Sequence, residues 1–479
     1  MVIHATMGGE GFNDEAWRAR LRGPLLCPQP DMAMALEAAH GLDRQAPGLS
    51  ARQTLSPKQR RIAARSLLVL TLLTLMMPEL PGILAMLVVP PAFVAIILFR
   101  LLLLAVAARK RSDSSAHSGA IPLLPVYTIL VALKDEAAVM PQLAWAMNSL
   151  DYPQDRIDLK LLVEEADLRT QAAIKAQTWP AGTELLVVPA GQPQTKPRAL
   201  NYGLARARGT YVVVYDAEDR PHPEQLKAAV DVFNSDGPET ACLQAPLVGV
   251  PAVGSWLARQ WSLEYAIQFG LIVPALARLG LPVALGGTSN HFRRTALVRA
   301  GGWDAWNVTE DADLGLRLAR LGYRVGAIQS PTLEAPPEEG RVWRGQRSRW
   351  LKGYMQTWCV LMRGRNEAPG LKPLGFLSVQ LTLGAAILSA MVHGPWALWC
   401  VACLFSPDLS LGPFGLSALI LSLATGALSA SLAPGAWNRQ RLTDILTLPF
   451  YWPLQTLAMV RALWSLIHTP HYWVKTPHV

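Results

Sequence analysis

Three acidic side chains follow one stretch of the chain that has the character of a buried strand. Residues Tyr211–Tyr215 ("YVVVY") are β-branched or aromatic and include no turn residue, which is typical of a strand covered on both faces. Asp216, Glu218 and Asp219 follow within four positions. Crowded carboxylates repel one another unless a positive charge lies between them. The pattern favours a divalent cation with oxygen ligands, and an acidic surface turn before a helix is the simpler alternative.

Acidic clusters also follow two other predicted strands. Residues Val126–Lys134 end in "KDE", and Leu159–Glu165 end in "EEAD", which contributes Glu164 and Glu165. The carboxyl ends of parallel strands meet at one edge of a sheet, and in open α/β sheets that edge is where ligands bind. We therefore expect the three clusters to share one crevice.

Basic side chains that could face the phosphates of a substrate occur in two places. Lys196 and Arg198 lie in "KPRALNYG", and Arg347 and Arg349 lie in "GQRSRWLKGYMQTW", next to Trp350. The second stretch has the pattern of a helix. Its alternative interpretation is a basic helix on a membrane surface, because apolar segments begin soon after it.

A further acidic pair, Glu310 and Asp311, follows Thr309 at the start of a predicted amphipathic helix. The simplest interpretation is an N-cap and an acidic first turn. The helix dipole at this position lowers the pKa of Asp311, which would make it a weak base. If Asp311 acts as a base, we expect some neighbour to offset this effect, for example burial under a bound acceptor.

The region between residues 121 and 370 alternates predicted strands and helices, which predicts an α/β domain with a mostly parallel sheet. Besides the strands above, we predict helices over Pro141–Leu150, Leu168–Thr178 and Pro197–Arg208 and a strand over Glu184–Pro189. No G-x-G-x-x-G follows the first strand, and no G-x-x-x-x-G-K-[ST] occurs. Dinucleotide-binding and P-loop interpretations are therefore poorly supported.

The composition is too apolar for an ordinary soluble enzyme. Of the 479 residues, 51% are hydrophobic and only 16% are charged, which indicates membrane segments. The net charge of +9 fits basic residues beside membrane helices together with an anionic substrate. No long basic run with interleaved aromatic residues occurs, so no nucleic-acid partner is expected. Cys400 and Cys403 form a C-x-x-C in an apolar run, where packing is the better account.

Apolar segments flank the predicted domain on both sides. Residues 1–60 are expected to form a cytoplasmic tail, and 61–110 a transmembrane hairpin that turns at "MMPELPG"; one long kinked helix is the alternative. Basic clusters at both ends of the hairpin predict that both ends are cytoplasmic. Residues 371–470 are expected to hold four further segments, and 471–479 a cytoplasmic tail. The four segments are 375–393, 395–406, 412–433 and 443–467.

This arrangement predicts six crossings, a cytoplasmic middle domain and both termini inside. If all four later segments cross the membrane, Arg439 and Arg441 fall outside, against the positive-inside rule. One of the four could instead lie along the interface.

Taken in order, the motifs "EE", "KPRALN", "DAED", "TED" and "QRSRW" resemble those of the membrane-embedded, processive members of glycosyltransferase family 2, which include cellulose and hyaluronan synthases. The resemblance covers about residues 60–477. "GGTSNHFRR" (Gly286–Arg294) and "WVKTPH" (Trp473–His478) resemble a bacterial branch of that group. It implies an A-type glycosyltransferase fold inserted between transmembrane helices of the bacterial inner membrane.

The resemblance also implies roles for single residues. Asp311 would be the general base, with Glu310 beside it. Asp216 and Glu218 would match the D-x-D motif that binds Mg²⁺ or Mn²⁺; Glu replaces the second Asp of the motif, and Asp219 is the spare ligand. The implied contacts to the UDP-sugar involve Glu164, Glu165, Lys196, Asp216, Gln346, Arg349 and Trp350. The implied contacts to the acceptor involve Trp350, Asn290 and His291.

The resemblance implies an inverting enzyme that elongates a β-glucan-like polysaccharide from UDP-glucose and passes it across the inner membrane. Inversion needs one base to take the proton of the acceptor hydroxyl, and a single Asp suffices. The expected partners are the UDP-sugar, the growing polysaccharide, membrane lipid and a periplasmic or regulatory subunit. The alternatives are a non-processive transferase that adds one sugar to a lipid carrier, and a transporter or scaffold with no catalytic role. The identity of the sugar and the linkage stay open.

Overall fold

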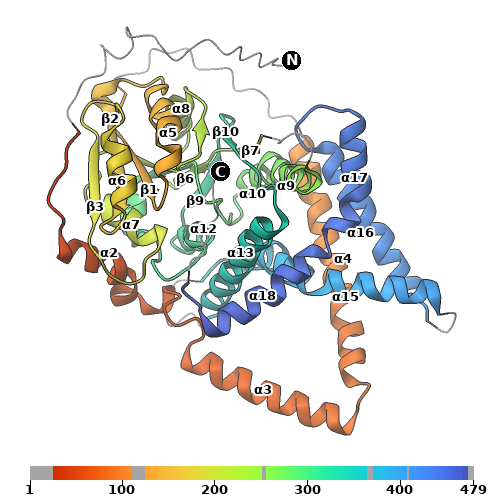
Figure 1. The fold of residues 1–479 in the computed structure, drawn as a ribbon. Coiled ribbons are helices and arrows are strands. Elements are labelled where there is room, and N and C mark those ends of the chain that lie inside the picture. Colours follow the sequence, from red (N-terminus) through yellow and green to blue (C-terminus); the bar gives the residue numbers. More distant parts are fainter. Residues whose placement is uncertain (1–24, 110–123, 251–254, 364–369, 407–408, 473–479) are drawn as a thin grey trace.

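A seven-stranded β-sheet forms the centre of the domain that holds the acidic clusters (Figure 1). The computed structural model describes residues 25–109, 124–250, 255–363, 370–406 and 409–472. In spatial order the strands are β3-β2-β1-β4-β8-β6-β9, and only β8 runs antiparallel to its neighbours. Their bounds are β1 Tyr127–Leu133, β2 Ile157–Glu164, β3 Glu184–Val188, β4 Tyr211–Tyr215, β6 Thr240–Gln244, β8 Asn290–Arg293 and β9 Arg324–Ala327.

Alternate residues of each central strand pack into two cores on opposite faces of the sheet. In β1, Ile129 and Val131 belong to one core and Leu130 to the other, as the two-residue period of a strand requires. The helices that contribute to the first core are α5 Met140–Asn148, α6 Leu168–Lys175 and α8 Gln225–Ser235. Those that contribute to the second include α7 Lys196–Leu204, α11 Arg294–Arg299 and α12 Glu310–Arg320.

The predicted α/β architecture with a mostly parallel sheet is confirmed, and the predicted strands and helices up to Tyr215 lie within a few residues of the observed ones. The strands β2, β1 and β4, which precede the three acidic clusters, are direct neighbours. The later strands were not predicted because they are short. These include a second, three-stranded sheet of β5 Arg220–Pro221, β7 Leu247–Gly249 and β10 Thr332–Glu334.

Two helical elements lie between the sheet and the apolar helices (Figure 1). The first is α9, Trp256–Ile267, which continues through a π-helical turn at Gln268–Ile272 into α10, Val273–Arg278. The second is α13, Gly340–Leu361, which carries the "QRSRW" motif. These elements connect the sheet to the rest of the molecule.

Three apolar stretches among the described residues are long and apolar enough to cross a membrane: Leu80–Ala108, Pro373–Phe405 and Gly415–Leu432. This is half of the six crossings expected. The apolar region comprises α3 Pro57–Met76, α4 Leu80–Ala108, α14 Pro373–Val379, α15 Ala385–Phe405, α16 Gly412–Leu432, α17 Arg439–Tyr451 and α18 Leu454–His468. Three features account for the difference: the basic first half of α3, the continuous stretch Pro373–Phe405 where two segments were predicted, and the shortness of α17 and α18.

Two of the predicted C-terminal boundaries are wrong, both because of prolines. The predicted break near residue 394 is absent, since α15 continues through Pro395. The Thr456 hydroxyl accepts from Gly394 N at 2.8 Å and donates to Ala390 O at 2.7 Å, which satisfies the backbone groups that the proline disrupts. The predicted single segment 443–467 is instead two helices that meet at Trp452 and Pro453.

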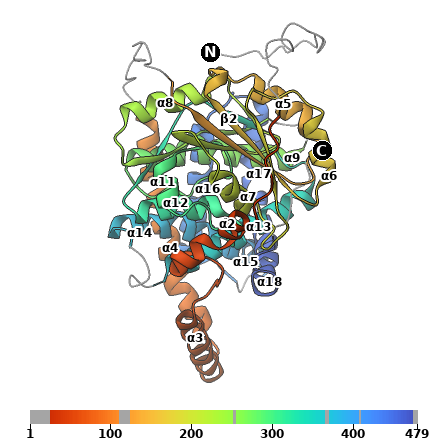
Figure 2. The same ribbon diagram turned by 90° about the vertical axis from the view of Figure 1, so that its left-hand side faces the viewer.

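The described part of the N-terminal region packs against the catalytic domain instead of forming a separate tail. Helix α2, Met32–Gln45, lies against α7 (Figure 2). The backbone of Leu26 bonds with Thr183 and Leu185 at the edge of the sheet. Residues 1–24 and the "WVKTPH" motif lie outside the described residues.

Candidate active site

One cavity of about 560 Å³ extends from the carboxyl ends of β1, β2 and β4 to the apolar helices α4, α15 and α16. Its wall includes Asp216 at the sheet and Arg100 on α4, so the sheet edge and the membrane-type helices share one space. The residues predicted from the sequence that line it are Glu164, Lys196, Asp216, Glu218, Glu310, Asp311, Gln346, Arg349 and Trp350.

Lys196 is the positive charge at the acidic end of this cavity. It begins α7, and its Nζ forms an ion pair with Asp216 and donates to Gly287 O at 2.7 Å. Burial lowers the pKa of Lys196, but the charges of Asp216 and Glu310 outweigh burial and raise the pKa above its ordinary value. Lys196 is therefore protonated at neutral pH and partly neutralises the acidic cluster.

Asp219 holds the acidic turn together instead of lining the cavity. It is 1% exposed, and its Oδ2 accepts from Asp216 N at 2.7 Å and from the Thr288 hydroxyl. Its Oδ1 is buried without a hydrogen-bond partner. Asp216 and Glu218, which do line the cavity, are thus the two acids of the motif that a ligand can reach.

The acids at this end crowd one another strongly. Burial, followed by the charges of Asp216 and Asp219, raises the pKa of Glu218 well above its ordinary value. Burial and the charge of Asp216 raise the pKa of Asp219 to about 7. Burial and the same cluster of charges raise the pKa of Glu334, on β10, well above its ordinary value. Glu334 was missed from the sequence because its strand is only three residues long.

This donor set fits a divalent cation. Four carboxylates gather here: two that reach the cavity, a third with a buried oxygen that has no hydrogen-bond partner, and a fourth at Glu334. Such a cluster favours a cation, bound by the carboxylate oxygens, that compensates the negative charge. No group of three or more metal-type side chains is assembled as a complete site among the described residues. The side chains that would hold the ion are Asp216 and Glu218, and phosphate oxygens of a substrate are the natural remaining ligands.

Asp311 and Glu310 lie in the first turn of α12, at the middle of the cavity wall. Burial raises the pKa of Asp311 above its ordinary value, so it outweighs the lowering expected from the helix dipole. Burial and the charge of Asp311 raise the pKa of Glu310 to about 7. Asp311 Oδ1 accepts from Ala312 N at 2.8 Å.

A row of aromatic rings from α9 and α13 borders the cavity. Trp261 stacks on Tyr265 with centroids 3.7 Å apart, and Tyr265 stacks on Trp350 at 6.0 Å and 27°. The Trp261 indole N–H donates to Gln346 Oε1 at 2.9 Å, which fixes that side chain. Flat rings with one wet edge are suited to the apolar faces of sugars.

An ion pair links this row to the apolar helices. Arg347 Nη1 lies 2.7 Å from Glu264 Oε1, and Tyr451 of α17 donates to Glu264 Oε2 at 2.9 Å. The Arg347 guanidinium also lies over the Trp350 ring, 4.5 Å from its centroid. Glu264, Tyr265 and Tyr451 were missed because they come from helices far from the motifs in sequence.

Besides Asp219, four residues that the sequence predictions place in the site lie elsewhere in the structure. Glu165 is turned away from the cavity, and its Oε2 accepts from Ala190 N at 3.0 Å. Arg198 does not face the cavity; it pairs with Glu164 at 3.3 Å and donates to Pro189 O. Its charge is used to hold the loop after β3 to the end of β2.

The other two are Asn290 and His291 of β8, which do not line the cavity. Asn290 Nδ2 donates to Gly286 O at 2.6 Å. His291 is fully buried, with one ring nitrogen 2.7 Å from the Tyr127 hydroxyl and the other 3.1 Å from Gln225 Oε1. Burial lowers the pKa of His291 to about 3. An acceptor contact by His291 is therefore wrong, because its side chain is part of the core.

The mostly parallel sheet with acidic side chains at one edge has the α/β architecture of a glycosyltransferase fold. The chain belongs to glycosyltransferase family 2: the family model "Glycosyl transferase family group 2" matches residues 211–469, more than half of the chain. The chain is thus an enzyme of the glycosyltransferase class. The match confirms the family that the five sequence motifs indicated, but not the processive subgroup within it.

Three known proteins show how far the similarity reaches. The beta-monoglucosyldiacylglycerol synthase of Synechocystis sp. is 28% identical over 376 residues, which are 74% of this chain and 75% of that one. The glucomannan 4-beta-mannosyltransferase 2 of Arabidopsis thaliana is 23% identical over 60% of this chain and 55% of its own length. The structure of the mannosyltransferase PcManGT from Pyrobaculum calidifontis, in complex with GDP-Man and Mn²⁺, superposes with a TM-score of 0.53. It is 21% identical, covers 80% of this chain and 97% of its own, and shows the shared fold.

Proposed function

We propose that this protein is an inverting membrane glycosyltransferase that transfers glucose from UDP-glucose to the end of a β-linked glucan and repeats the transfer. The observation that carries the proposal is the single cavity that joins the acidic sheet edge to the apolar helices. An acceptor that occupies the apolar end can place its terminal hydroxyl beside Asp311 while the donor occupies the acidic end.

The donor end suits a sugar nucleotide with its diphosphate. Glu164, at the end of β2, is positioned to meet the nucleoside, and Lys196 and Arg349 supply positive charge for the phosphates. Mg²⁺ or Mn²⁺ held by Asp216 and Glu218 would stabilise the charge that develops on the leaving diphosphate. PcManGT, which shares the fold, was solved with a sugar nucleotide and Mn²⁺.

Asp311 is the base in this proposal. The acceptor hydroxyl attacks C1 of glucose and its proton passes to Asp311, while the C1–O bond breaks and its electron pair leaves with UDP. Since attack and departure occur on opposite faces, the α-linkage of the donor becomes a β-linkage. Lys196 and Arg349 hold positive charge where the leaving group becomes more negative.

Polar and aromatic side chains along the apolar helices favour a saccharide acceptor. Ser389, His393, Thr425 and Gln455 line this part of the cavity, and the His393 ring stacks on Trp452 at 5.5 Å. Helices that faced only lipid would gain nothing from such residues. The aromatic row at Trp350 would bind the sugar units nearest the reaction.

A second candidate function is the addition of one glucose to a membrane lipid such as a diacylglycerol. The cavity wall beside α4 is formed by apolar side chains, Phe93, Ile96, Ile97 and Leu103 among them, which an acyl chain could contact. The Synechocystis relative, which matches 74% of this chain, carries the name of a glucosyldiacylglycerol synthase.

Sizing of the product distinguishes the two functions. Purified protein in lipid nanodiscs is incubated with radiolabelled UDP-glucose and Mg²⁺, with and without added diacylglycerol. Polymer that grows with time and is degraded by a β-glucanase supports the proposal. A single glycolipid that requires diacylglycerol overturns it in favour of the second function. Parallel reactions with UDP-N-acetylglucosamine and UDP-galactose identify the sugar, and the Asp311→Asn variant is the inactive control.

A further inference from the structure

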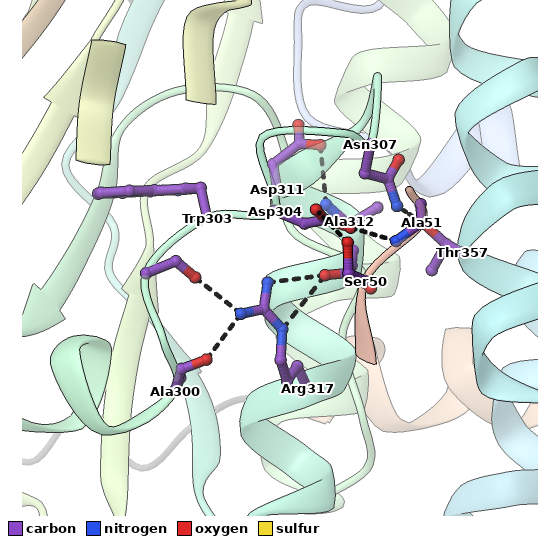
Figure 3. Close-up of polar contacts among 12 residues, drawn as sticks. Ser50, Ala51, Ala300, Trp303, Asp304, Asn307, Asp311, Ala312, Arg317 and Thr357 are labelled. Atoms are coloured by element: carbon purple, nitrogen blue, oxygen red, sulfur yellow. Dashed lines mark hydrogen bonds and ion pairs between the residues drawn. The ribbon is translucent and has the colours of Figure 1, made fainter. Parts of the chain in front are cut away.

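The loop between Trp303 and Thr309 leads directly into the helix that carries Asp311, and a distant segment of the chain holds it. Asp304, in this loop, is buried. Its carboxylate accepts from the Ser50 hydroxyl at 3.1 Å and from Ala51 N at 2.5 Å, as Figure 3 shows. It also accepts from Trp306 N at 3.1 Å. We call residues 46–53, which supply the first two of these donors, the N-terminal strap.

Trp306, two residues further along the loop, receives contacts from both ends of the chain. Its indole N–H donates to Ala39 O of α2 at 3.0 Å, and the Arg52 guanidinium lies 5.3 Å from its ring centroid. His471, near the other end of the described chain, packs edge-on against the same ring at 5.1 Å. The two ring nitrogens of His471 lie 2.8 Å from Trp306 O and 3.2 Å from Arg52 O.

The same loop is tied to the helix that carries Gln346, Arg349 and Trp350. Asn307 Nδ2 donates to Thr357 Oγ1 of α13 at 2.9 Å (Figure 3). The backbone N–H of Val308 donates to Gln356 Oε1 of the same helix at 3.2 Å. The loop therefore sets the position of α12 relative to α13, and these two helices supply opposite parts of the cavity wall.

We propose that Asp304, Trp306 and the N-terminal strap position Asp311 for proton transfer. The residues from Trp303 to Thr309 form no helix or strand, so their path depends on these side-chain contacts. A shift of the loop would pass directly to the first turn of α12, where Asp311 lies. A misplacement of about 1 Å at a reacting group can lower a rate by about 10²-fold. This proposal rests on the role of Asp311 in the proposed function.

The strap and His471 meet at Arg52 O but hold the loop through different bonds. The strap bonds to Asp304 and lies over Trp306, whereas His471 bonds to Trp306 alone among the loop residues. None of Ser50, Asp304 and Trp306 lines the cavity. Their substitution should therefore lower kcat and leave the binding of the donor unchanged.

The test compares Asp304→Ala with Asp304→Asn in the full-length protein in nanodiscs. In Asp304→Asn the amide oxygen can still accept from Ala51 N and the amide N–H can donate to Ser50, but Trp306 N loses the oxygen that it shares with Ser50. We expect Asp304→Ala to lower kcat at least tenfold with the KM for UDP-glucose within twofold, and Asp304→Asn to restore part of the loss. Trp306→Phe keeps the ring but loses the bond to Ala39, and should lower kcat three- to tenfold.

The matched control is Arg44→Ala, which removes an exposed ion pair with Glu37 on the same N-terminal helix and should leave kcat unchanged. Thermal unfolding in detergent monitors the folded fraction. The positioning role is overturned if Asp304→Ala and Trp306→Phe keep wild-type kcat, or if Asp304→Asn restores none of the loss. Failure of the proposed function is a separate result: it is seen as transfer by Asp311→Asn at the wild-type rate.

Discussion

Lys196 and Asp216 form an ion pair at the acidic end of the cavity, although they lie 20 residues apart and belong to different elements. Lys196 begins α7, and Asp216 follows β4, so the pair forms only because the sheet brings the carboxyl end of β4 beside the N-terminus of that helix. The same carboxylate is the one that we expect to bind a cation. Lys196 and the cation would therefore compete for the same Asp216 carboxylate.

This competition leads to a prediction for Lys196→Gln. Without the ammonium group, Asp216 is free to bind metal, so Mn²⁺ should bind the donor-free protein severalfold more tightly in an electron-paramagnetic-resonance titration. Turnover should nevertheless fall at least tenfold, about 1.4 kcal/mol in the barrier, because positive charge beside the diphosphate is lost. The control is Lys175→Gln, an exposed lysine on α6. Weaker Mn²⁺ binding in Lys196→Gln would show that the two cations do not compete.

Removal of the acidic ligands themselves gives a second prediction. Asp216→Asn should abolish Mg²⁺-dependent turnover while the protein still inserts and unfolds at the wild-type temperature, because the amide keeps the shape but not the charge. Chelation of the wild-type protein should give the same loss, reversed by added Mg²⁺ or Mn²⁺. Glu218→Asp is the informative partner, since retained activity would show that the shorter acid is tolerated. Full activity of Asp216→Asn in Mg²⁺ would contradict the assignment.

The pH dependence of turnover tests the assignment of the base. Asp311 must be deprotonated to accept a proton, so kcat should fall as the pH is lowered through its pKa. Burial raises that pKa, and the acid limb should therefore lie above the ordinary aspartate value of about 3.8. Asp311→Asn should lower kcat by about 10²–10⁴-fold at every pH and leave UDP affinity unchanged by calorimetry.

Glu310 provides the matched comparison for this profile. Burial and the charge of Asp311 raise the pKa of Glu310 to about 7, so Glu310 loses its charge as the pH falls through this value. In Glu310→Gln the fall of kcat at low pH should therefore occur at the same pH as in the wild type, and any inflection of the pH profile near pH 7 should disappear. Its kcat should stay within tenfold of the wild-type value. An acid limb that disappears in Glu310→Gln would assign the base to Glu310 instead.

The sequence identified the sheet edge and the motif residues because their signals are local. A strand such as β4 can be predicted from its five β-branched or aromatic residues. The acidic side chains that follow the parallel strands lie at one edge of the sheet because the carboxyl ends of parallel strands meet there. His291 and Asp219 could not be placed in this way. Both lie in recognisable motifs, but whether a side chain faces a cavity or the core depends on its partners, Tyr127 and Gln225 for His291 and Thr288 for Asp219.

The contacts made by the N-terminal strap could not be predicted from the sequence either. Ser50 and Asp304 are 254 residues apart, and neither lies in a motif. The same limit applies to the apolar helices, where hydropathy alone suggested six crossings. The positions of the helix ends depend on their contacts with the catalytic domain, and these contacts lead to a different topology.

From the contacts at the helix ends we expect four crossings. The strap before α3 bonds to the α/β domain, and α4 ends where that domain begins (Figure 1), so we expect α3 and α4 to pass outward and back although α3 is basic in its first half. At 29 residues α4 is about 43 Å long, more than the ~30 Å of a bilayer core. Helices α15 and α16 form the second such pair.

The remaining helices, α17 and α18, stay on the side of the catalytic domain. Asp444 of α17 pairs with Arg259 of α9 at 3.0 Å, and Arg441 donates to Ala433 O at 2.8 Å, at the end of α16. Lys352 of α13 donates to Thr469 O at 3.1 Å, after α18. Both ends of this pair thus contact the domain, and we therefore expect Arg441 on the same side as the domain, in agreement with the positive-inside rule.

Reporter fusions can test this arrangement directly. We expect fusions after Pro81 and after Ser406 to report the periplasm, because these positions end the outward-going helices α3 and α15. A fusion after Gly435, between α16 and α17, should report the cytoplasm, whereas six crossings would place it outside. The two models therefore differ at Gly435 and also at Ser406, which six crossings would place in the cytoplasm. Alkaline phosphatase activity at Gly435 would support six crossings, and β-galactosidase activity there would support four with α17 and α18 at the interface.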